Sequence, residues 1–197
     1  MIRRLLAQGA LKATGWKVRG PVPAPSDTRI FVGAPHTSNF DTFLMLAVAW
    51  QNDLRVRFLI KKEALRGPLG WFFGSVGAIA VDRDNPEGLI DELIHLAETG
   101  HGFQLVLTPE GTRKPVEYWK SGFYRLSQET GIPMILVSPD GPTKVVTFGP
   151  TFPASGDVRA DMDRIRDFFA DKRGIDPRKV RVPRLRAEAV DEESATG

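Results

Sequence analysis

Apolar residues gather in short runs along the chain, and polar or glycine-rich stretches separate these runs. Several runs are rich in Val, Ile, Leu and Phe and short enough to be buried strands. They cover residues 29–34, 56–60, 78–81, 103–107, 134–137 and 144–148. Longer segments between them are predicted to be helices, at 41–51, 86–99, 121–131 and 158–172. The basic, glycine-rich connection 61–77 is expected to hold one more short helix.

Strands that alternate with helices are typical of an α/β sandwich around a largely parallel sheet. We therefore expect a single-domain α/β sandwich over residues 28–182, with a mixed, largely parallel sheet flanked by helices. A chain of 197 residues is long enough for one such domain with a sizeable core. Residues 1–27 are expected to form an amphipathic helix and a turn-rich linker. Residues 183–197 are expected to form a polar tail, disordered after Pro183.

The N-terminal segment 2–14 carries apolar residues at helical spacing together with Arg3, Arg4 and Lys12, and Trp16 follows it. A basic amphipathic helix of this kind is typical of a membrane interface, but it also fits a terminal helix packed on the domain. Both interpretations stay open on the sequence alone. No segment reaches the roughly 18 apolar residues of a spanning helix, and no signal-peptide pattern is present. We therefore expect neither export nor a membrane span.

Composition and charge exclude some kinds of chemistry and indicate which partners suit the chain. Because the chain has no cysteine, disulfides, thiolate catalysis and cysteine-based zinc sites are excluded. The net charge is only +3, but residues 1–20 carry five cations and no acid, and residues 53–66 are also basic. Such a basic front end suits an anionic surface such as phospholipid. Nucleic acid is not expected as a partner, because no nucleic-acid-binding motif accompanies these cations.

His36 follows the first predicted strand directly, and Asp41 lies five positions later at the start of a predicted helix. In α/β proteins, active sites gather at the carboxyl ends of the strands. A carboxylate folded back onto an imidazole makes a general base, because it holds the ring tautomer and stabilises the imidazolium. Taken alone, the pair also fits a structural role, with Asp41 as a helix N-cap.

The segment Thr108–Arg113 follows another buried strand. Gly111 allows a tight turn and a close approach to a ligand. Arg113 offers a planar fork that suits phosphate, and Glu110 is placed to orient Arg113 or to accept a hydroxyl from a substrate. Taken alone, this segment also fits a plain surface loop with a Glu–Arg pair.

A third group of polar residues comes from Lys61, the glycine turns that follow it, and Asp82 with Arg83. Lysines at a strand end beside glycine turns suit an anionic head group. The alternative is a solvated basic face with a strand-end ion pair between Asp82 and Arg83.

Together and in this order, these blocks resemble the glycerolipid acyltransferase family, of the lysophosphatidic acid acyltransferase type. The resemblance covers about residues 30–138, and Pro109–Arg113 downstream of His36 and Asp41 is its most specific part. A proline in an apolar strand, Pro133, completes the pattern. Thr108, Lys114 and Pro35 depart from the usual residues, and these departures leave the acceptor open.

The resemblance implies that His36 deprotonates an acceptor hydroxyl and that Asp41 orients His36. The oxygen then attacks the thioester of acyl-CoA or acyl carrier protein, without a covalent acyl-enzyme, a cofactor or a metal. The residues implied to hold the acceptor are Glu110, Gly111, Thr112 and Arg113, with Arg113 on its phosphate and Arg83 and Lys61 as secondary contacts. The expected acceptor is a lysophospholipid such as 1-acylglycerol-3-phosphate, in phospholipid synthesis or remodelling. The expected location is cytoplasmic, peripheral at the inner face of the cell membrane.

Two alternatives remain. In a thioesterase-like hydrolase, His36 and Asp41 would activate water in place of a lipid hydroxyl. A non-catalytic lipid-binding protein would bind the membrane surface without turnover. A P-loop enzyme, a dinucleotide-binding enzyme and a serine hydrolase are not expected, because their glycine motifs are absent.

Overall fold

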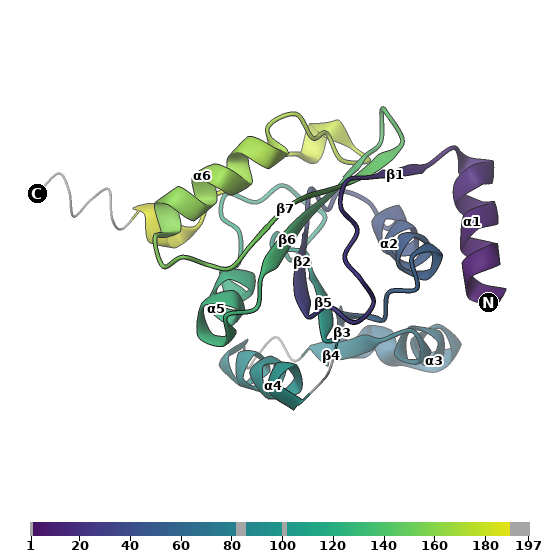
Figure 1. Ribbon diagram of the computed structural model, residues 1–197, viewed down its shortest axis with the longest axis horizontal. Coiled ribbons are helices and arrows are strands. Elements are labelled where there is room, and N and C mark those ends of the chain that lie inside the picture. The colour runs from purple at the N-terminus through teal and green to yellow at the C-terminus, as the bar shows by residue number, and fades with distance from the viewer. Residues whose placement is uncertain (1, 82–85, 100–101, 190–197) are drawn as a thin grey trace, which may run out of the picture.

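The computed structural model describes residues 2–81, 86–99 and 102–189. Its centre is a seven-stranded sheet with the order β1-β7-β6-β2-β5-β3-β4, in which only the β6–β7 pair is antiparallel (Figure 1). The predicted mixed, largely parallel α/β sandwich is therefore confirmed. The strands are β1 Lys17–Arg19, β2 Arg29–Gly33, β3 Val56–Lys61, β4 Ala78–Val81, β5 Gln104–Leu107, β6 Met134–Asp140 and β7 Val145–Phe152.

Helices cover both faces of the sheet, and Figure 1 shows α1, α2 and α3 on one side with α4, α5 and α6 on the other. Alternate residues of β2 supply the two cores, because successive strand side chains point to opposite faces. Phe31 packs with the α1–α2 layer, and Ile30 and Val32 pack with the other layer. The helices are α1 Ile2–Thr14, α2 Phe40–Gln51, α3 Gly67–Ser75, α4 Pro86–Thr99, α5 Gly122–Thr130 and α6 Val158–Phe169, with 3₁₀ turns η1 Lys62–Leu65 and η2 Pro177–Lys179.

The pairing of β2 with β5 positions the site. The two strands are parallel neighbours, and Val32 lies opposite Leu107 near their carboxyl ends. The loops that leave these strands therefore start side by side, although 74 residues separate His36 from Glu110. One of these loops leads to α2, and the other leads towards α5.

Two segments differ from the sequence-based expectation. Strand β1 was not predicted, since it is short and mostly exposed; it pairs with β7, with Val18 opposite Val146. The disorder expected after Pro183 is wrong for residues 184–189. Leu185 is only 2% exposed and bridges to Trp119, and Glu188 pairs with Arg166 at 2.7 Å. The rest of the expected tail, residues 190–197, lies outside the described residues.

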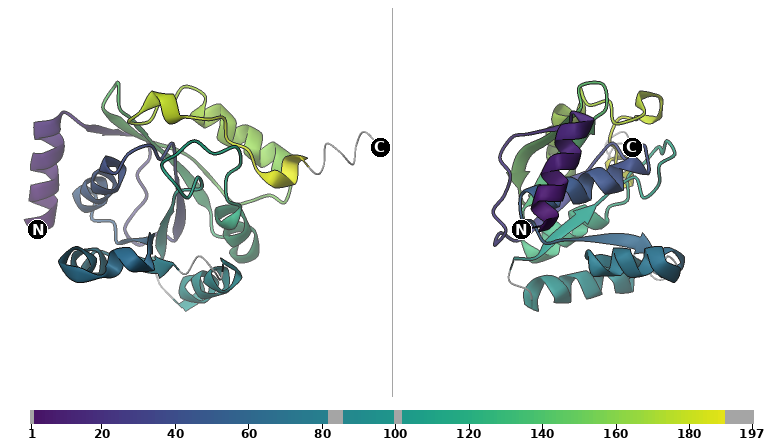
Figure 2. Two further views of the ribbon diagram at one scale, coloured as in Figure 1. Left: turned by 180° about the vertical axis from the view of Figure 1, so that it is seen from behind. Right: turned by 90° about the vertical axis from the view of Figure 1, so that its right-hand side faces the viewer.

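Helix α1 packs along α2 (Figure 2), and it also presents apolar side chains to solvent. Ala7 and Leu11 are buried, whereas Ile2, Leu5 and Leu6 are 73%, 61% and 64% exposed. One side of the helix is packed, which confirms a terminal helix on the domain, and the other side is open. Contact of this open side with a membrane stays a prediction. Among the described residues, no helix combines the length and the apolar character that crossing a membrane requires.

Candidate active site

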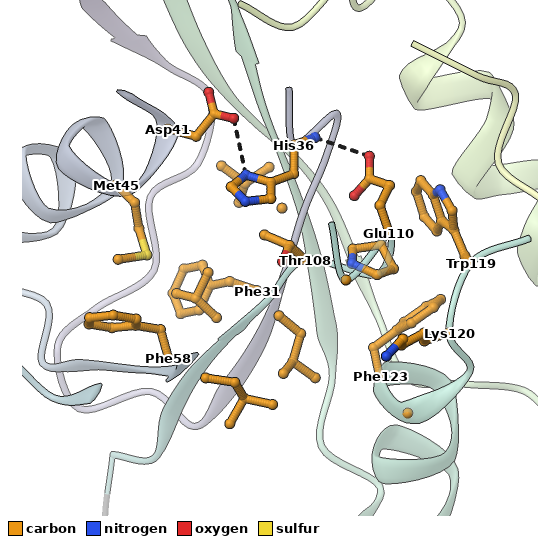
Figure 3. A pocket seen from close by; sticks show the side chains of 18 of the residues that line it. Phe31, His36, Asp41, Met45, Phe58, Thr108, Glu110, Trp119, Lys120 and Phe123 are labelled. Atoms are coloured by element: carbon orange, nitrogen blue, oxygen red, sulfur yellow. Dashed lines mark hydrogen bonds and ion pairs between the residues drawn. The ribbon is translucent and has the colours of Figure 1, made fainter. Parts of the chain in front are cut away.

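His36 and Asp41 meet at the carboxyl end of β2. The Nδ1 atom of His36 lies 3.0 Å from Oδ2 of Asp41, and both side chains are largely buried (Figure 3). In the neutral tautomer that donates its Nδ1–H to this carboxylate, Nε2 carries a lone pair that can accept a proton from a substrate. The geometry is that of a general base with an orienting carboxylate.

The turn between these two residues is built around the Asp41 carboxylate. Its Oδ2 atom also accepts hydrogen bonds from the backbone amides of Thr37 at 2.8 Å and Ser38 at 2.9 Å. Asp41 is not the N-cap of α2, which is Asn39. One carboxylate therefore holds both the turn and the imidazole, while its Oδ1 atom is buried without a hydrogen-bond partner in the described part of the chain.

Glu110 joins the second loop to the first. Its Oε1 atom accepts the backbone N–H of His36 at 3.0 Å. Its Oε2 atom is buried and has no hydrogen-bond partner among the described residues. Burial raises the pKa of the Glu110 carboxyl above its ordinary value of 4.5, against the opposing hydrogen bond from His36. Glu110 therefore fixes the His36 backbone and leaves its second carboxylate oxygen buried and unpaired among the described residues.

The raised pKa of Glu110 predicts how the free energy of unfolding depends on pH. The folded state holds the Glu110 proton more tightly than the unfolded state, so this group's contribution to stability falls as pH rises above about 4.5. Thermal unfolding from pH 4.5 to 8 should show the unaltered protein losing stability relative to Glu110→Gln, by about 1.4 kcal/mol for each unit of pKa shift. A difference that stays constant or moves the other way would contradict the assignment.

Of the other residues predicted for the site, some line the pocket with Glu110 and some do not. Gly111 donates its N–H to the carbonyl of Thr108 at 2.9 Å and has a positive φ of 63°. Thr112 lines the same pocket as Glu110, and its hydroxyl accepts the backbone N–H of Lys114 at 3.3 Å. Arg113 is exposed and does not line that pocket.

Lys61, at the end of β3, is exposed and lines the pocket. Arg83 and Asp82 lie outside the described residues, so their expected contacts stay predictions. No group of three or more side chains suited to a metal ion occurs in the described segments. The expectation that no metal takes part is left as a prediction.

A pocket of about 1230 Å³ opens at His36, Asp41 and Glu110. Its walls are mainly apolar, and its lining residues come from both core layers, such as Phe31 from one and Trp119 and Phe123 from the other (Figure 3). Aromatic and aliphatic side chains line it, among them Phe31, Met45, Val48, Phe58, Leu107, Trp119 and Phe123. A large, mainly apolar pocket beside a His–Asp pair suits a substrate that carries a hydrocarbon chain next to its reactive group.

The sequence did not predict the hydrogen bonds that join Thr37 to the C-terminal segment. The Thr37 hydroxyl accepts the backbone amides of Ile175 and Asp176, each at 3.0 Å, and Lys179 donates to the Thr37 carbonyl at 3.0 Å. This C-terminal segment therefore holds the turn that carries His36. No local sequence pattern predicts these hydrogen bonds, because the partners of Thr37 lie 138 residues or more further along the chain.

Comparison with known proteins agrees with this geometry. The model of the Acyltransferase family matches residues 15–139, which include His36, Asp41 and the segment 109–113. The chain therefore belongs to the Acyltransferase family, and the resemblance seen in its motifs is confirmed. Among curated proteins, no sequence matches it.

A solved structure shares the fold. The crystal structure of the 1-acyl-sn-glycerophosphate acyltransferase PlsC from Thermotoga maritima superposes with a TM-score of 0.61 at 18% identity. The match covers 91% of this chain and 79% of that one. At this identity the likeness establishes the architecture, and the family match defines the class as acyltransferase.

Proposed function

We propose that this protein transfers a fatty acyl group from acyl-CoA or acyl carrier protein to a hydroxyl of a lysophospholipid such as 1-acylglycerol-3-phosphate. The observation that carries the proposal is the His36–Asp41 pair, in which Nδ1 of His36 lies 3.0 Å from Oδ2 of Asp41, beside a large, mainly apolar pocket. The acyltransferase of the same fold from Thermotoga maritima acts on 1-acyl-sn-glycerophosphate, which supports the choice of acceptor.

The proposed reaction follows from the positions of these groups. Nε2 of His36 takes the proton of the acceptor hydroxyl as its oxygen attacks the thioester carbonyl. The new C–O bond forms, the C–S bond breaks, and the imidazolium returns the proton to the leaving thiolate. Asp41 stabilises the imidazolium in between, because its carboxylate is 3.0 Å from Nδ1. No covalent acyl-enzyme is needed.

The loop after β5 is proposed to hold the acceptor. Glu110 lines the pocket, and its Oε2 atom, which has no hydrogen-bond partner among the described residues, is the proposed acceptor for a substrate hydroxyl. Gly111 and Thr112 line the pocket next to it, and Lys61 adds a positive charge from the neighbouring strand end. Arg113, being exposed beside this loop, is proposed to contact the phosphate from outside the pocket.

The proposed site of action is the cytoplasmic membrane surface, and α1 supplies a test. Burying the exposed side chains of Leu5 and Leu6 in a bilayer would add about 1.5–3 kcal/mol each. The double variant Leu5→Glu, Leu6→Glu should therefore bind phosphatidylglycerol-containing vesicles at least about tenfold more weakly in a sedimentation assay. Val182→Glu, at a site 61% exposed near the C-terminus, is the control and should bind like the unaltered protein. Equal binding by all three proteins would count against α1 as the contact.

The test of function is release of free CoA from palmitoyl-CoA, with and without lysophosphatidic acid. Release that depends on the acceptor supports acyl transfer. Release without any acceptor, accompanied by free fatty acid, would indicate a thioesterase. No release with any acceptor, or with acyl carrier protein as the donor, would favour a non-catalytic lipid-binding protein.

A further inference from the structure

Lys120 lies in a short segment that is held on both sides. Its backbone N–H donates to the carbonyl of Pro109 at 2.8 Å, in the same loop as Glu110. The preceding residue, Trp119, donates its N–H to the carbonyl of Arg184 at 2.7 Å and is buried. The backbone at Lys120 is therefore fixed relative to the loop after β5.

The Lys120 side chain passes over Gly111. A Cβ atom at position 111 would lie 2.9 Å from Cε and 3.1 Å from Cδ of Lys120, closer than side-chain carbons normally approach. The missing side chain at Gly111 thus makes room for the lysine stem as well as for the turn. With its stem seated there, Lys120 lines the same pocket as Thr108 and Phe123 (Figure 3).

The ammonium group of Lys120 faces this pocket without a counter-ion. Among the described residues, no side chain or carbonyl pairs with it by hydrogen bond or ion pair. Arg166, by contrast, pairs with Glu188 at 2.7 Å, and Arg125 pairs with Glu129 at 3.5 Å. Lys120 is an exposed residue that lines the pocket, so its charge is accessible both to solvent and to a ligand in the pocket.

We propose that Lys120 binds the phosphate group of a substrate in this pocket. Lys120 and Arg113 are both exposed residues, but Lys120 lines the pocket and Arg113 does not. Lys120 would therefore meet the phosphate inside the pocket, whereas Arg113 would contact it only from outside. The inference rests on the proposed acyl transfer, in which either the acceptor or CoA brings a phosphate. A lysine ammonium suits this task as a compact point charge that needs no fixed fork geometry.

Direct binding tests the proposal independently of turnover. The variants are Lys120→Met, which keeps the stem on Gly111 without the charge, and Lys120→Arg, which restores the charge. The control is Lys114→Met, at an exposed lysine that does not line the pocket. Calorimetry would compare 1-hexanoylglycerol 3-phosphate with neutral 1-hexanoylglycerol, and hexanoyl-CoA with the hexanoyl thioester of N-acetylcysteamine.

We expect Lys120→Met to raise the Kd of a phosphate-bearing ligand about 10- to 100-fold, the range for a hydrogen bond to a charged group. Its neutral counterpart should bind unchanged, and Lys120→Arg should recover much of the loss. If only 1-hexanoylglycerol 3-phosphate loses affinity, the phosphate at Lys120 is that of the lysophospholipid. If only hexanoyl-CoA loses affinity, the phosphate is that of CoA. Both outcomes support a phosphate site at Lys120.

The proposal is overturned if Lys120→Met weakens charged and neutral ligands equally, because the lysine would then act only through the shape of the loop. It is also overturned if Lys120→Met binds like Lys114→Met, or if the unaltered protein does not distinguish phosphate-bearing from neutral ligands. Charge-selective binding without acceptor-dependent CoA release would refute the acyl transfer and leave the phosphate site standing.

Discussion

Replacing His36 by alanine should lower the turnover of acyl transfer by about 10²–10⁴-fold, the usual contribution of a general base. The reason is that Nε2 of His36 is the atom proposed to take the hydroxyl proton, with Nδ1 held by Asp41 at 3.0 Å. The measurement is kcat for acceptor-dependent CoA release, together with the thermal unfolding midpoint of each protein.

The matched control is His95→Ala. His95 is exposed on α4 and does not line the pocket, so this variant should keep its turnover. If His36→Ala kept its turnover as well, the base assignment would be wrong. If its unfolding midpoint fell steeply, lost folding would explain the lost activity.

Replacing Asp41 by asparagine should also reduce turnover, on the order of 10²–10⁴-fold, because a neutral amide neither stabilises the imidazolium nor reliably selects the tautomer with its proton on Nδ1. Stability should change little, since the asparagine oxygen still accepts the amides of Thr37 and Ser38. Asp41→Ala leaves both amides without this acceptor and should cost about 1–3 kcal/mol for each amide that stays unsatisfied. Kinetics and thermal unfolding of the two variants separate these effects.

The two residues should also act as one unit. Turnover of the double variant His36→Ala, Asp41→Asn should be no lower than that of His36→Ala alone, because Asp41 acts through the imidazole. If the two losses multiplied, Asp41 would have a second role in the reaction. Asp41→Asn with full turnover would show that the carboxylate serves only the turn.

The architecture was largely predictable from the sequence. Apolar runs such as 29–34 and 103–107 correspond to β2 and β5, because strands of a parallel sheet are buried on both faces and read as continuous apolar segments. Strand β1 gave no such signal, since it has three residues and pairs with Val145–Thr147, far along the chain. The burial of Leu185 was not predicted for a similar reason. A single apolar residue in a polar stretch gives no pattern, and its burial depends on its distant partner Trp119.

The sequence by itself determined the class of the protein and its central pair. His36 and Asp41 are only five residues apart, so a single turn brings them together. The tertiary structure decided the rest. The contact of Glu110 with the His36 backbone requires β2 and β5 to be neighbours. The hydrogen bonds to the Thr37 hydroxyl come from the C-terminal segment. Lys120 reaches the pocket by crossing Gly111. Periodicity and motifs record local conformation and burial, whereas the meeting of distant segments depends on strand order and side-chain packing, which no single stretch of sequence contains.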